Sequence, residues 1–166
     1  MSEALVIRSA DQDDIATIGY LAHQIWPVAY QKIISDTQLN YMLDLFYSPE
    51  ALERQITEQQ HHFIIAEIDL EEVGFASFSR LDAANWKLHK LYVLPGLQGR
   101  GVGRALLDMV EEEVRTQQGA HLLLNVNKFN PAIRFYETMG FQIEKEEVID
   151  IGQGYVMDDY VMGKDV

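Results

Sequence analysis

The sequence predicts a mixed α/β domain of the α+β type, with one sheet and helices on its faces. Three observations support this prediction. Helical periodicity dominates the first third of the chain, three β-rich runs follow one another from residue 62, and helical and extended patterns alternate in the remainder. The chain has 166 residues, of which 48% are hydrophobic, enough to bury a substantial core. We therefore expect a single domain over residues 1–166.

The first third predicts a strand followed by three helices. LVIR at 5–8 reads as the strand, and Asp11 is a candidate N-cap for a helix whose apolar positions fall on one face. Pro27 is expected to end that helix or to follow its end closely. Ser35 begins a capping-box pattern before a second helix, and Ser48, followed by proline, opens a third.

The middle of the chain predicts strands. HFIIAEI, VGFASFS and WKLHKLYV are β-rich runs separated by short polar segments, a pattern that suits an antiparallel meander. After a glycine-rich segment, apolar residues recur at helical spacing from Val102 and predict an amphipathic helix that closes near Gly119.

The last third predicts a strand, a helix and a hairpin. HLLLNVN is a short apolar strand, and Asn130 with the following proline starts a helix that Gly140 caps. FQIEKEEVID and YVMDDYVMG, divided by GQG, predict a closing hairpin.

Composition narrows the classes of function. Thirteen basic and 26 acidic residues give a net charge of −13, which opposes nucleic acid or an anionic membrane as a partner and favours a cationic substrate. Acidity for solubility alone is the plainer explanation. The absence of cysteine excludes disulfides and thiolate chemistry. With no apolar span or signal-peptide pattern at the start, we expect a cytoplasmic protein. A homodimer is left open.

The segment GLQGRGVG (96–103) has three explanations. It binds a phosphate-bearing ligand, it makes a tight turn at positive φ, or it packs a helix closely on a strand. The P-loop and Rossmann patterns both fail here, because the lysine, the hydroxyl and the third glycine that they need are absent. With these two motifs excluded, the segment reads as a glycine-rich turn between a strand and the N-terminus of a helix. Such an arrangement can bind a pyrophosphate, and Arg100 and Arg104 add positive charge.

Two ordered motifs decide between these explanations. LYVLPGLQGRGVGRALLDMVEE resembles the acetyl-CoA-binding segment of the GNAT superfamily of N-acetyltransferases, whose [QR]-x-x-G-x-[GA] pattern is matched by Gln98, Gly101 and Gly103. LLLNVNKFNPAIRFYETMGFQIEKEE resembles the next segment of the same superfamily. The resemblance covers residues 88–146. It implies an acyl-CoA N-acyltransferase domain with a mostly antiparallel sheet of about seven strands, helices on both faces and a splayed central strand pair.

The resemblance also implies acetyl-CoA as co-substrate. Residues from Gln98 to Arg104 are expected to wrap the pyrophosphate, the backbone from Leu91 to Val93 is expected to pair with the pantetheine arm, and Asn130 resembles the coenzyme-contacting asparagine. An N-cap role for Asn130 is equally compatible. The expected coenzyme-binding residues are Leu91, Tyr92, Val93, Gln98, Gly99, Arg100, Gly101, Val102, Gly103, Arg104, Asn130 and Tyr136.

Two side chains are candidates for catalysis. Tyr136 matches the tyrosine that protonates the departing thiolate in many members, and its alternative is a core tyrosine. Where members often place a glutamate on the central strand, this chain has His89, whose ordinary pKa suits a base acting directly or through water. The alternative is a structural histidine on the strand face of Leu91 and Val93.

The remaining histidines are not expected to act. His61, His62 and His121 stand at strand starts and are expected to be solvated or turn residues. Because no two histidines show ligand spacing, we expect no metal.

The acceptor is predicted to be a primary amine. YMLDLFYSPEAL (41–52) and DIGQGYVMDDYVM (150–162) resemble bacterial spermidine/spermine N-acetyltransferases, which implies a polyamine. An acidic, aromatic groove for it would consist of Asp44, Glu50, Asp158, Asp159, Trp26, Tyr30 and Tyr41. The alternatives are a protein, peptide or drug amine as acceptor, or a non-catalytic acyl-CoA-binding regulatory module.

Overall fold

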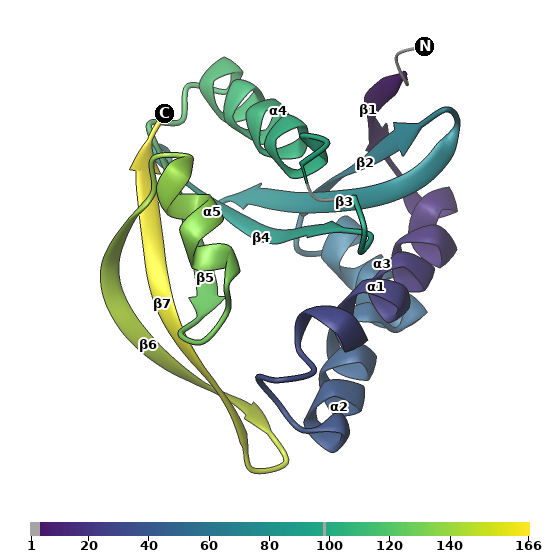
Figure 1. Cartoon of the computed structure of the whole chain (residues 1–166). Helices are drawn as coiled ribbons and strands as arrows, with labels where there is room; N and C mark the ends of the chain where they lie inside the picture. Colours follow the sequence, from purple (N-terminus) through teal and green to yellow (C-terminus); the bar gives the residue numbers. More distant parts are fainter. Residues whose placement is uncertain (1–3, 98) are drawn as a thin grey trace.

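The computed structural model describes residues 4–97 and 99–166. The described residues form one seven-stranded sheet in the order β1-β2-β3-β4-β5-β7-β6, with helices on both faces (Figure 1). This confirms the predicted fold class. The elements in chain order are β1 (Leu5–Ala10), α1 (Ile15–Ala29), α2 (Asp36–Tyr47), α3 (Pro49–Thr57), β2 (His62–Ile68), β3 (Glu71–Arg80), β4 (Asn85–Val93), α4 (Val102–Thr116), β5 (His121–Asn127), α5 (Ala132–Thr138), β6 (Gln142–Gly152) and β7 (Tyr155–Asp165).

The predicted caps are present at the helix starts. Asp11 caps a short 3-10 turn that leads into α1, and its side chain accepts a hydrogen bond from the N–H of Asp13. Ser35 caps α2, and Ser48 caps α3 with proline at the first helical position. These side-chain oxygens satisfy N–H groups that have no acceptor inside the helix.

Pro27 does not end the first helix, contrary to the prediction. Helix α1 continues to Ala29, and the N–H of Tyr30 still donates to the carbonyl of Trp26 at 2.9 Å. Proline removes only its own N–H and crowds the carbonyl one turn earlier, so the residues that follow keep their donors. Trp26 is 4% exposed, and its burial holds this last turn against the core.

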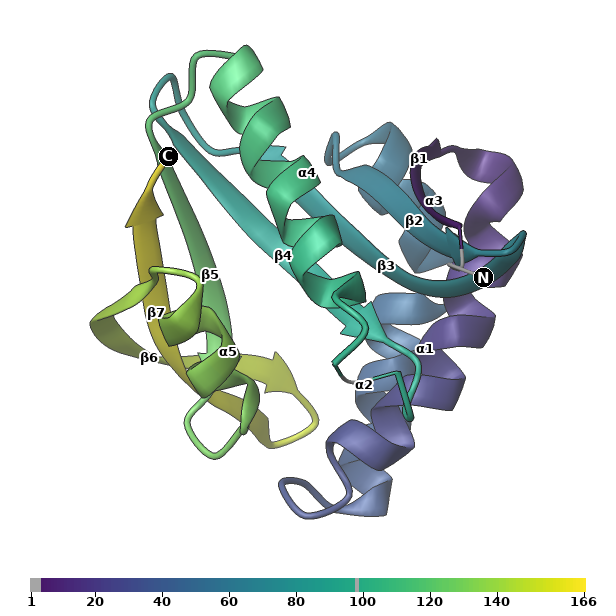
Figure 2. The same cartoon turned by 45° about the horizontal axis from the view of Figure 1, so that its top comes forward.

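Strand pairing divides the sheet in two. Strands β1 to β4 are antiparallel neighbours, and β5, β7 and β6 form a second antiparallel group. The halves are joined by parallel pairing of β4 with β5, which extends only from Asn85 to Leu88 on β4. Beyond that point the strands diverge, as Figure 2 shows. The splayed central pair was predicted, and the structure contains it.

Apolar cores lie on both sides of the sheet. On one face, α4 contributes Leu106, Leu107 and Val110 to a core shared with Leu122 of β5 and Phe141. On the other face, α1 to α3 bury a second core against β2 and β3. The α4 core includes Trp86 and Leu88 of β4 as well as Leu122 of β5, so it packs against both halves of the sheet.

The β6–β7 hairpin reaches across to α2. The hydroxyl of Tyr41 donates to the carbonyl of Ile151, and the Gln38 side chain donates to the carbonyl of Val156 at 3.3 Å. The rings of Tyr41 and Tyr155 also lie 5.3 Å apart. These contacts tie the hairpin tip to the helical layer beside the splay. No helix within residues 4–97 and 99–166 has the length and apolar character needed to cross a membrane.

Candidate functional site

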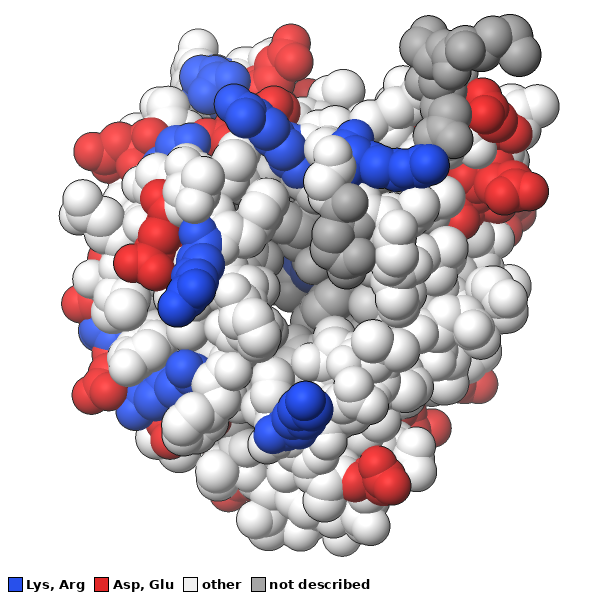
Figure 3. Space-filling model, in the orientation of Figure 1, with Lys and Arg blue, Asp and Glu red and all other residues white. Residues whose placement is uncertain are grey.

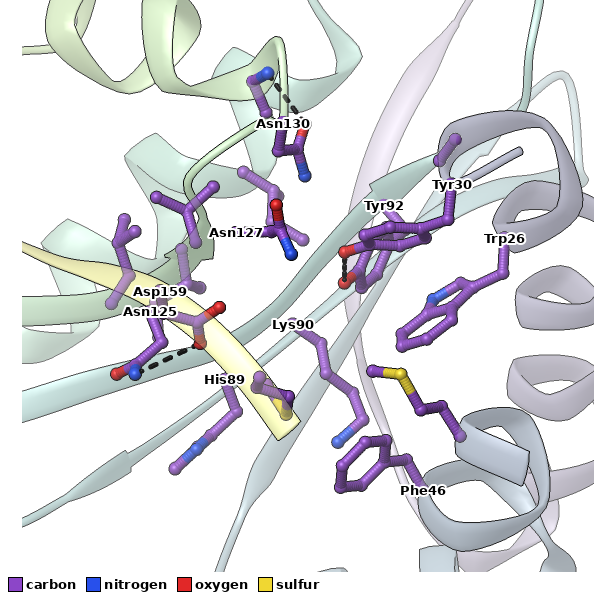
Figure 4. A pocket seen from close by; sticks show the side chains of 18 of the residues that line it. Trp26, Tyr30, Phe46, His89, Lys90, Tyr92, Asn125, Asn127, Asn130 and Asp159 are labelled. Atoms are coloured by element: carbon purple, nitrogen blue, oxygen red, sulfur yellow. Dashed lines mark hydrogen bonds between the residues drawn. The ribbon is translucent and has the colours of Figure 1, made fainter. Parts of the chain in front are cut away.

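A candidate site is a cavity of about 400 Å³ at the splay, which we call the central pocket. This volume lies in the range of small-molecule sites. Figure 4 shows side chains that converge on it from α1, α2, β4, β5 and β7. Its lining includes Trp26, Tyr30, Gln38, Met42, Phe46, Tyr47, Gln55, His61, Lys87, Leu88, His89, Lys90, Leu91, Tyr92, Val93, Asn125, Asn127, Asn130, Tyr136, Met157 and Asp159.

The backbone of β4 borders this pocket on one side. Tyr92 and Val93 pair with β3, but the recorded pairing with β5 stops at Leu88. Backbone groups on the β5 side of the outer half of β4 can therefore pair with an extended ligand, as an added strand would. The expected segment from Leu91 to Val93 is placed in the lining.

A β-bulge at His89 changes the direction of the side chains that follow. Lys90 lies opposite Ser77 and Leu88 lies opposite Phe78, which makes His89 the extra residue on β4. Leu91 consequently packs with the core under α4. The expectation that His89 shares a strand face with Leu91 and Val93 was therefore wrong, because the bulge reverses the alternation between them.

His89 lies against His61 on the α1 to α3 side of the sheet. The two rings stack with centroids 3.9 Å apart and planes within 10°, and Nε2 of His89 is 2.7 Å from the Ser79 hydroxyl. Burial, together with His61 and nearby lysines, lowers the pKa of His89 to about 2. His89 is therefore neutral near pH 7 and a poor proton acceptor, which argues against it as the base.

His61 was expected to be solvated, and it instead lines the central pocket. Burial, then the charges of Lys90 and Lys87, lowers its pKa to about 4. His121 also differs from the expectation, because its ring bridges Asp165 and Glu144 at 2.8 and 2.6 Å. Only His62 is exposed at its strand start, as predicted.

Tyrosines form one wall of the central pocket. The hydroxyls of Tyr30 and Tyr92 are 2.9 Å apart, and the Trp26 ring lies 4.6 Å from that of Tyr30. Burial raises the pKa of Tyr30 and Tyr92, so both stay protonated. Such a wall is apolar over the ring faces and offers hydroxyl groups at its edge.

Tyr136 reaches the central pocket from α5 on the other side of the splay. It is 8% exposed, and its ring packs edge-on against Phe135 and Phe141. Burial raises the pKa of this phenol, with a smaller contribution from Tyr30. The side chain is thus a buried phenol that stays protonated and lies in the lining of the central pocket.

Asp159 is the only carboxylate in the described lining of the central pocket. It is 2% exposed, and burial raises its pKa, while a weak 3.4 Å contact from the Asn125 amide partly opposes the shift. The charge of Lys87 also opposes the shift, but no described ion pair joins it to Asp159, so this buried carboxylate can attract a further positive group.

The predicted acidic groove does not assemble. Of its seven residues, Trp26, Tyr30 and Asp159 line the central pocket. Asp158 points to the other face of β7, because neighbouring strand residues alternate, and it pairs with Lys128 at 3.0 Å. The other three lie outside the lining: Asp44 and Glu50 are exposed, and Tyr41 holds the hairpin.

Lys90 is a site residue that the sequence analysis missed. It is 8% exposed and donates to Oε1 of Gln55 at 2.8 Å, over the rings of Tyr47 and Phe63. Burial lowers its pKa to about 7. In the sequence KLHKLYV, Lys90 reads as an ordinary polar residue of a strand with alternating faces. Its side chain faces the central pocket because of the bulge at His89, which the sequence does not reveal.

The glycine-rich segment joins β4 to α4. Gly96, Gly99 and Gly101 all have positive φ, and a Cβ at any of the three would meet nothing within 4 Å. Gly101 is the N-cap of α4 and has no side chain to cap it. The first-turn N–H groups thus lack an acceptor inside the helix, and the space beside them is open. Both the turn and the anion-site explanations fit; Gln98 lies outside the described residues.

The other residues expected to bind the coenzyme in this loop lie in different environments, some buried and some exposed. Val102 is 2% exposed and belongs to the core. A Cβ added at Gly103 would lie 3.6 Å from the Phe135 ring, so this position lies where α4 packs against α5. Arg100 and Arg104 are exposed beside the turn.

Asn130 lines the central pocket and also begins the α5 region. Its Oδ1 accepts a hydrogen bond from the N–H of Ala132 at 2.9 Å, the capping geometry considered for it. The Asn130 side chain also interacts with Tyr30 on the opposite wall of the central pocket.

Charge is unevenly placed around the site. In Figure 3, uncharged surface borders most of a hollow near the centre of the face, and acidic side chains gather toward the margins. Within the described ranges no group of three or more His, Asp or Glu side chains is arranged to hold a metal ion.

Comparison with known proteins relates the chain to one family. The model of the acetyltransferase (GNAT) domain matches residues 30–156. An uncharacterized N-acetyltransferase of Mycobacterium tuberculosis is 28% identical over 157 residues, which are 94% of this chain and 98% of that protein.

Two further comparisons involve Thermoplasma acidophilum. Its spermidine N(1)-acetyltransferase is 24% identical over 160 residues, 93% of this chain and 96% of that protein. The crystal structure of its PaiA N-acetyltransferase with coenzyme A superposes with a TM-score of 0.85 at 24% identity, covering 98% of this chain and 99% of that one. The latter likeness establishes the fold.

Replacing Lys90 by methionine should stabilise the protein at neutral pH. The lysine pKa is about 7 in the folded chain and about 10.4 when unfolded. Between these values the unfolded chain binds a proton that the folded chain does not, so wild-type stability rises with pH there. We expect Lys90→Met to gain on the order of 1–4 kcal/mol at pH 7 and to lose most of that gain by about pH 10, measured by urea unfolding. Exposed Lys32→Met is the control; an equal gain at both pH values would contradict the assignment.

Proposed function

The chain belongs to the acetyltransferase (GNAT) family, and on that premise we propose that the central pocket is where an acceptor amine meets the acetyl group. As a member, the protein is an acetyl-CoA-dependent N-acetyltransferase. The observation that carries the proposal is the splay itself, which opens a lined pocket between two strands and leads along β4 to a glycine-rich helix N-terminus.

The residues present fit coenzyme A in two places. The open space over Gly99 and Gly101, the uncapped first turn of α4 and the nearby arginines suit a pyrophosphate. The β5-facing backbone of Leu91 to Val93 suits an extended pantetheine arm. An N–H group of this strand would polarise the thioester carbonyl, a contribution of roughly 3–4 kcal/mol.

Tyr136 is proposed as the proton donor. Bound acetyl-CoA would supply an activated acetyl group with a thiolate as leaving group. The amine would form the new C–N bond as the C–S bond breaks, and the proton that Tyr136 holds would pass to the sulfur. The nitrogen then loses one of its own protons, which restores the phenol of Tyr136. The acceptor must first lose its own proton, which for an alkylamine of pKa ~10.4 costs about 4.6 kcal/mol at pH 7. Asp159, with its raised pKa, is a better placed acceptor for that proton than His89.

A polyamine is one candidate acceptor. The net charge of −13, buried Asp159 beside an aromatic wall and the similarity to a spermidine N(1)-acetyltransferase support it. Against it, the described lining holds one carboxylate and two lysines, so only one ammonium group of a polyamine would find a partner. A protein, peptide or drug amine remains the alternative.

Gly101→Glu should abolish coenzyme binding. The carboxylate would occupy the open space beside the α4 N-terminus and repel the pyrophosphate. At 100-fold its dissociation constant, coenzyme A should stabilise the wild type by about 2.7 kcal/mol, visible as a higher Tm. Gly154→Glu is the matched control, since Gly154 has the same positive φ and open surroundings in the β6–β7 turn. An equal Tm shift in both variants would mean that the loop is only a turn.

Tyr136→Phe should lower kcat on the order of 10²-fold while coenzyme affinity changes little. The substitution keeps the edge-on ring packing and removes the proton. Stopped-flow thiol release gives kcat, and calorimetry gives the Kd. Tyr20→Phe on exposed α1 surface removes a hydroxyl without effect. Turnover near that of the wild type would assign the acid elsewhere.

Asp159→Asn should raise the KM for spermidine about tenfold, equivalent to ~1.4 kcal/mol, and should also lower kcat, because the carboxylate proposed to accept the amine proton is lost. The matched control is Asp158→Asn, which removes the same charge outside the central pocket. If the field of the protein helps capture, kcat/KM should also fall between about 0.01 M and 1 M salt, where its reach shrinks from about 30 Å to about 3 Å. No acetylation of spermidine or spermine would end the polyamine proposal and leave acetyl transfer standing.

A further inference from the structure

Lys90 is a buried cation whose described surroundings provide no counter-charge. Its amine donates to the neutral amide of Gln55, and none of the described carboxylates lies within ion-pair distance of it. Figure 4 shows the lysine extending from β4 toward Phe46, into the central pocket. Burying a charged amine without a partner is unfavourable for folding.

The described neighbours of Lys90 add further hydrogen-bond donors and positive charge, and no negative charge. Gln55, His61, Lys87, His89 and Lys90 line one part of the central pocket, which we call the basic end. The charges of Lys87 and Lys90 both lower the pKa of the stacked histidines, so the two lysines lie close to His61 and His89. Blue side-chain atoms are visible inside the hollow in Figure 3. Within the basic end, donors are present and acidic groups are absent.

We propose that the acceptor amine carries a carboxylate, which binds at the basic end and pairs with Lys90. An anionic ligand group would complete a charge-assisted hydrogen bond that the described residues do not provide. A polycation would instead bring further positive charge to Lys87 and Lys90. The inference rests on the proposed acetyl transfer, because the amine of the same molecule must reach the splay near Tyr136.

The rest of the central pocket limits the class of acceptor. A volume of about 400 Å³, part of which the acetyl-bearing arm would fill, suits a small molecule of amino-acid size. Asp159 offers a site for the ammonium group, and Trp26, Tyr30 and Tyr92 provide apolar contact between the two ends. An amino acid, or a short chain with an amine and a carboxylate, matches these groups.

The test compares amines that differ only in the carboxylate. The substrates are ω-amino carboxylates of increasing length and phenylalanine, each with its carboxamide, and spermidine as the polycation. At pH 7, the wild type should prefer at least one carboxylate over its carboxamide about tenfold or more in kcat/KM, as expected for a charged hydrogen bond. In Lys90→Met that ratio should fall toward one. Lys32→Met, which removes an exposed lysine outside the lining, should keep it.

A binding measurement separates failure of this inference from failure of the proposed function. Calorimetry without acetyl-CoA follows the same carboxylates and carboxamides. Carboxylate binding that requires Lys90, with no transfer to any amine, would support the basic end and overturn the proposed function. Transfer with carboxylate-to-carboxamide ratios that are equal in wild type and Lys90→Met would overturn the inference and leave acetyl transfer intact, as would preference for spermidine over every carboxylate.

Discussion

The early end of the parallel pairing between β4 and β5 is the constraint on which the site depends. Pairing stops at Leu88, and the two strands then diverge with side chains and backbone facing a common space. The α4 core packs against both halves of the sheet, and the α1 to α3 core packs against β2 and β3. Beyond the splay, the β6–β7 hairpin contacts α2. The open site in the middle of the sheet is thus bordered by packed elements on both sides.

Keeping this space polar lowers the stability of the fold. Lys90 and Asp159 are both nearly fully buried, and neither forms an ion pair among the described residues. In an ordinary core, apolar residues at both positions would be favoured. Their unfavourable burial is concentrated around one cavity, while the cores on either side are almost wholly apolar. Such concentration is typical of a site kept ready for a ligand.

The sequence predicted most elements because their signals are local. Caps such as Ser35 and Ser48, the α4 periodicity and the turn glycines depend on a few neighbouring residues. The site was predicted in part: Tyr136, Asn130 and the segment from Leu91 to Val93 line the central pocket. Lys90 and the stacking of His61 on His89 were missed, because they depend on pairing between distant strands. Asp158 was wrongly assigned to the groove, because two consecutive aspartates on a strand face opposite ways and the sequence alone does not say which of them faces inward.

The extra residue at His89 shifts the alternation of side chains by one position along the rest of β4. Before it, Trp86 and Leu88 face the α4 core; after it, Leu91 and Val93 do, and Lys90 and Tyr92 face the other way. If the same residues paired with β3 without the bulge, the two sets would exchange, which would send a lysine into the α4 core and leucine and valine into the opposite layer. Proteins that retain the bulge can therefore alter ligand contacts by point substitution, whereas loss of the bulge without loss of a residue would change core and site together.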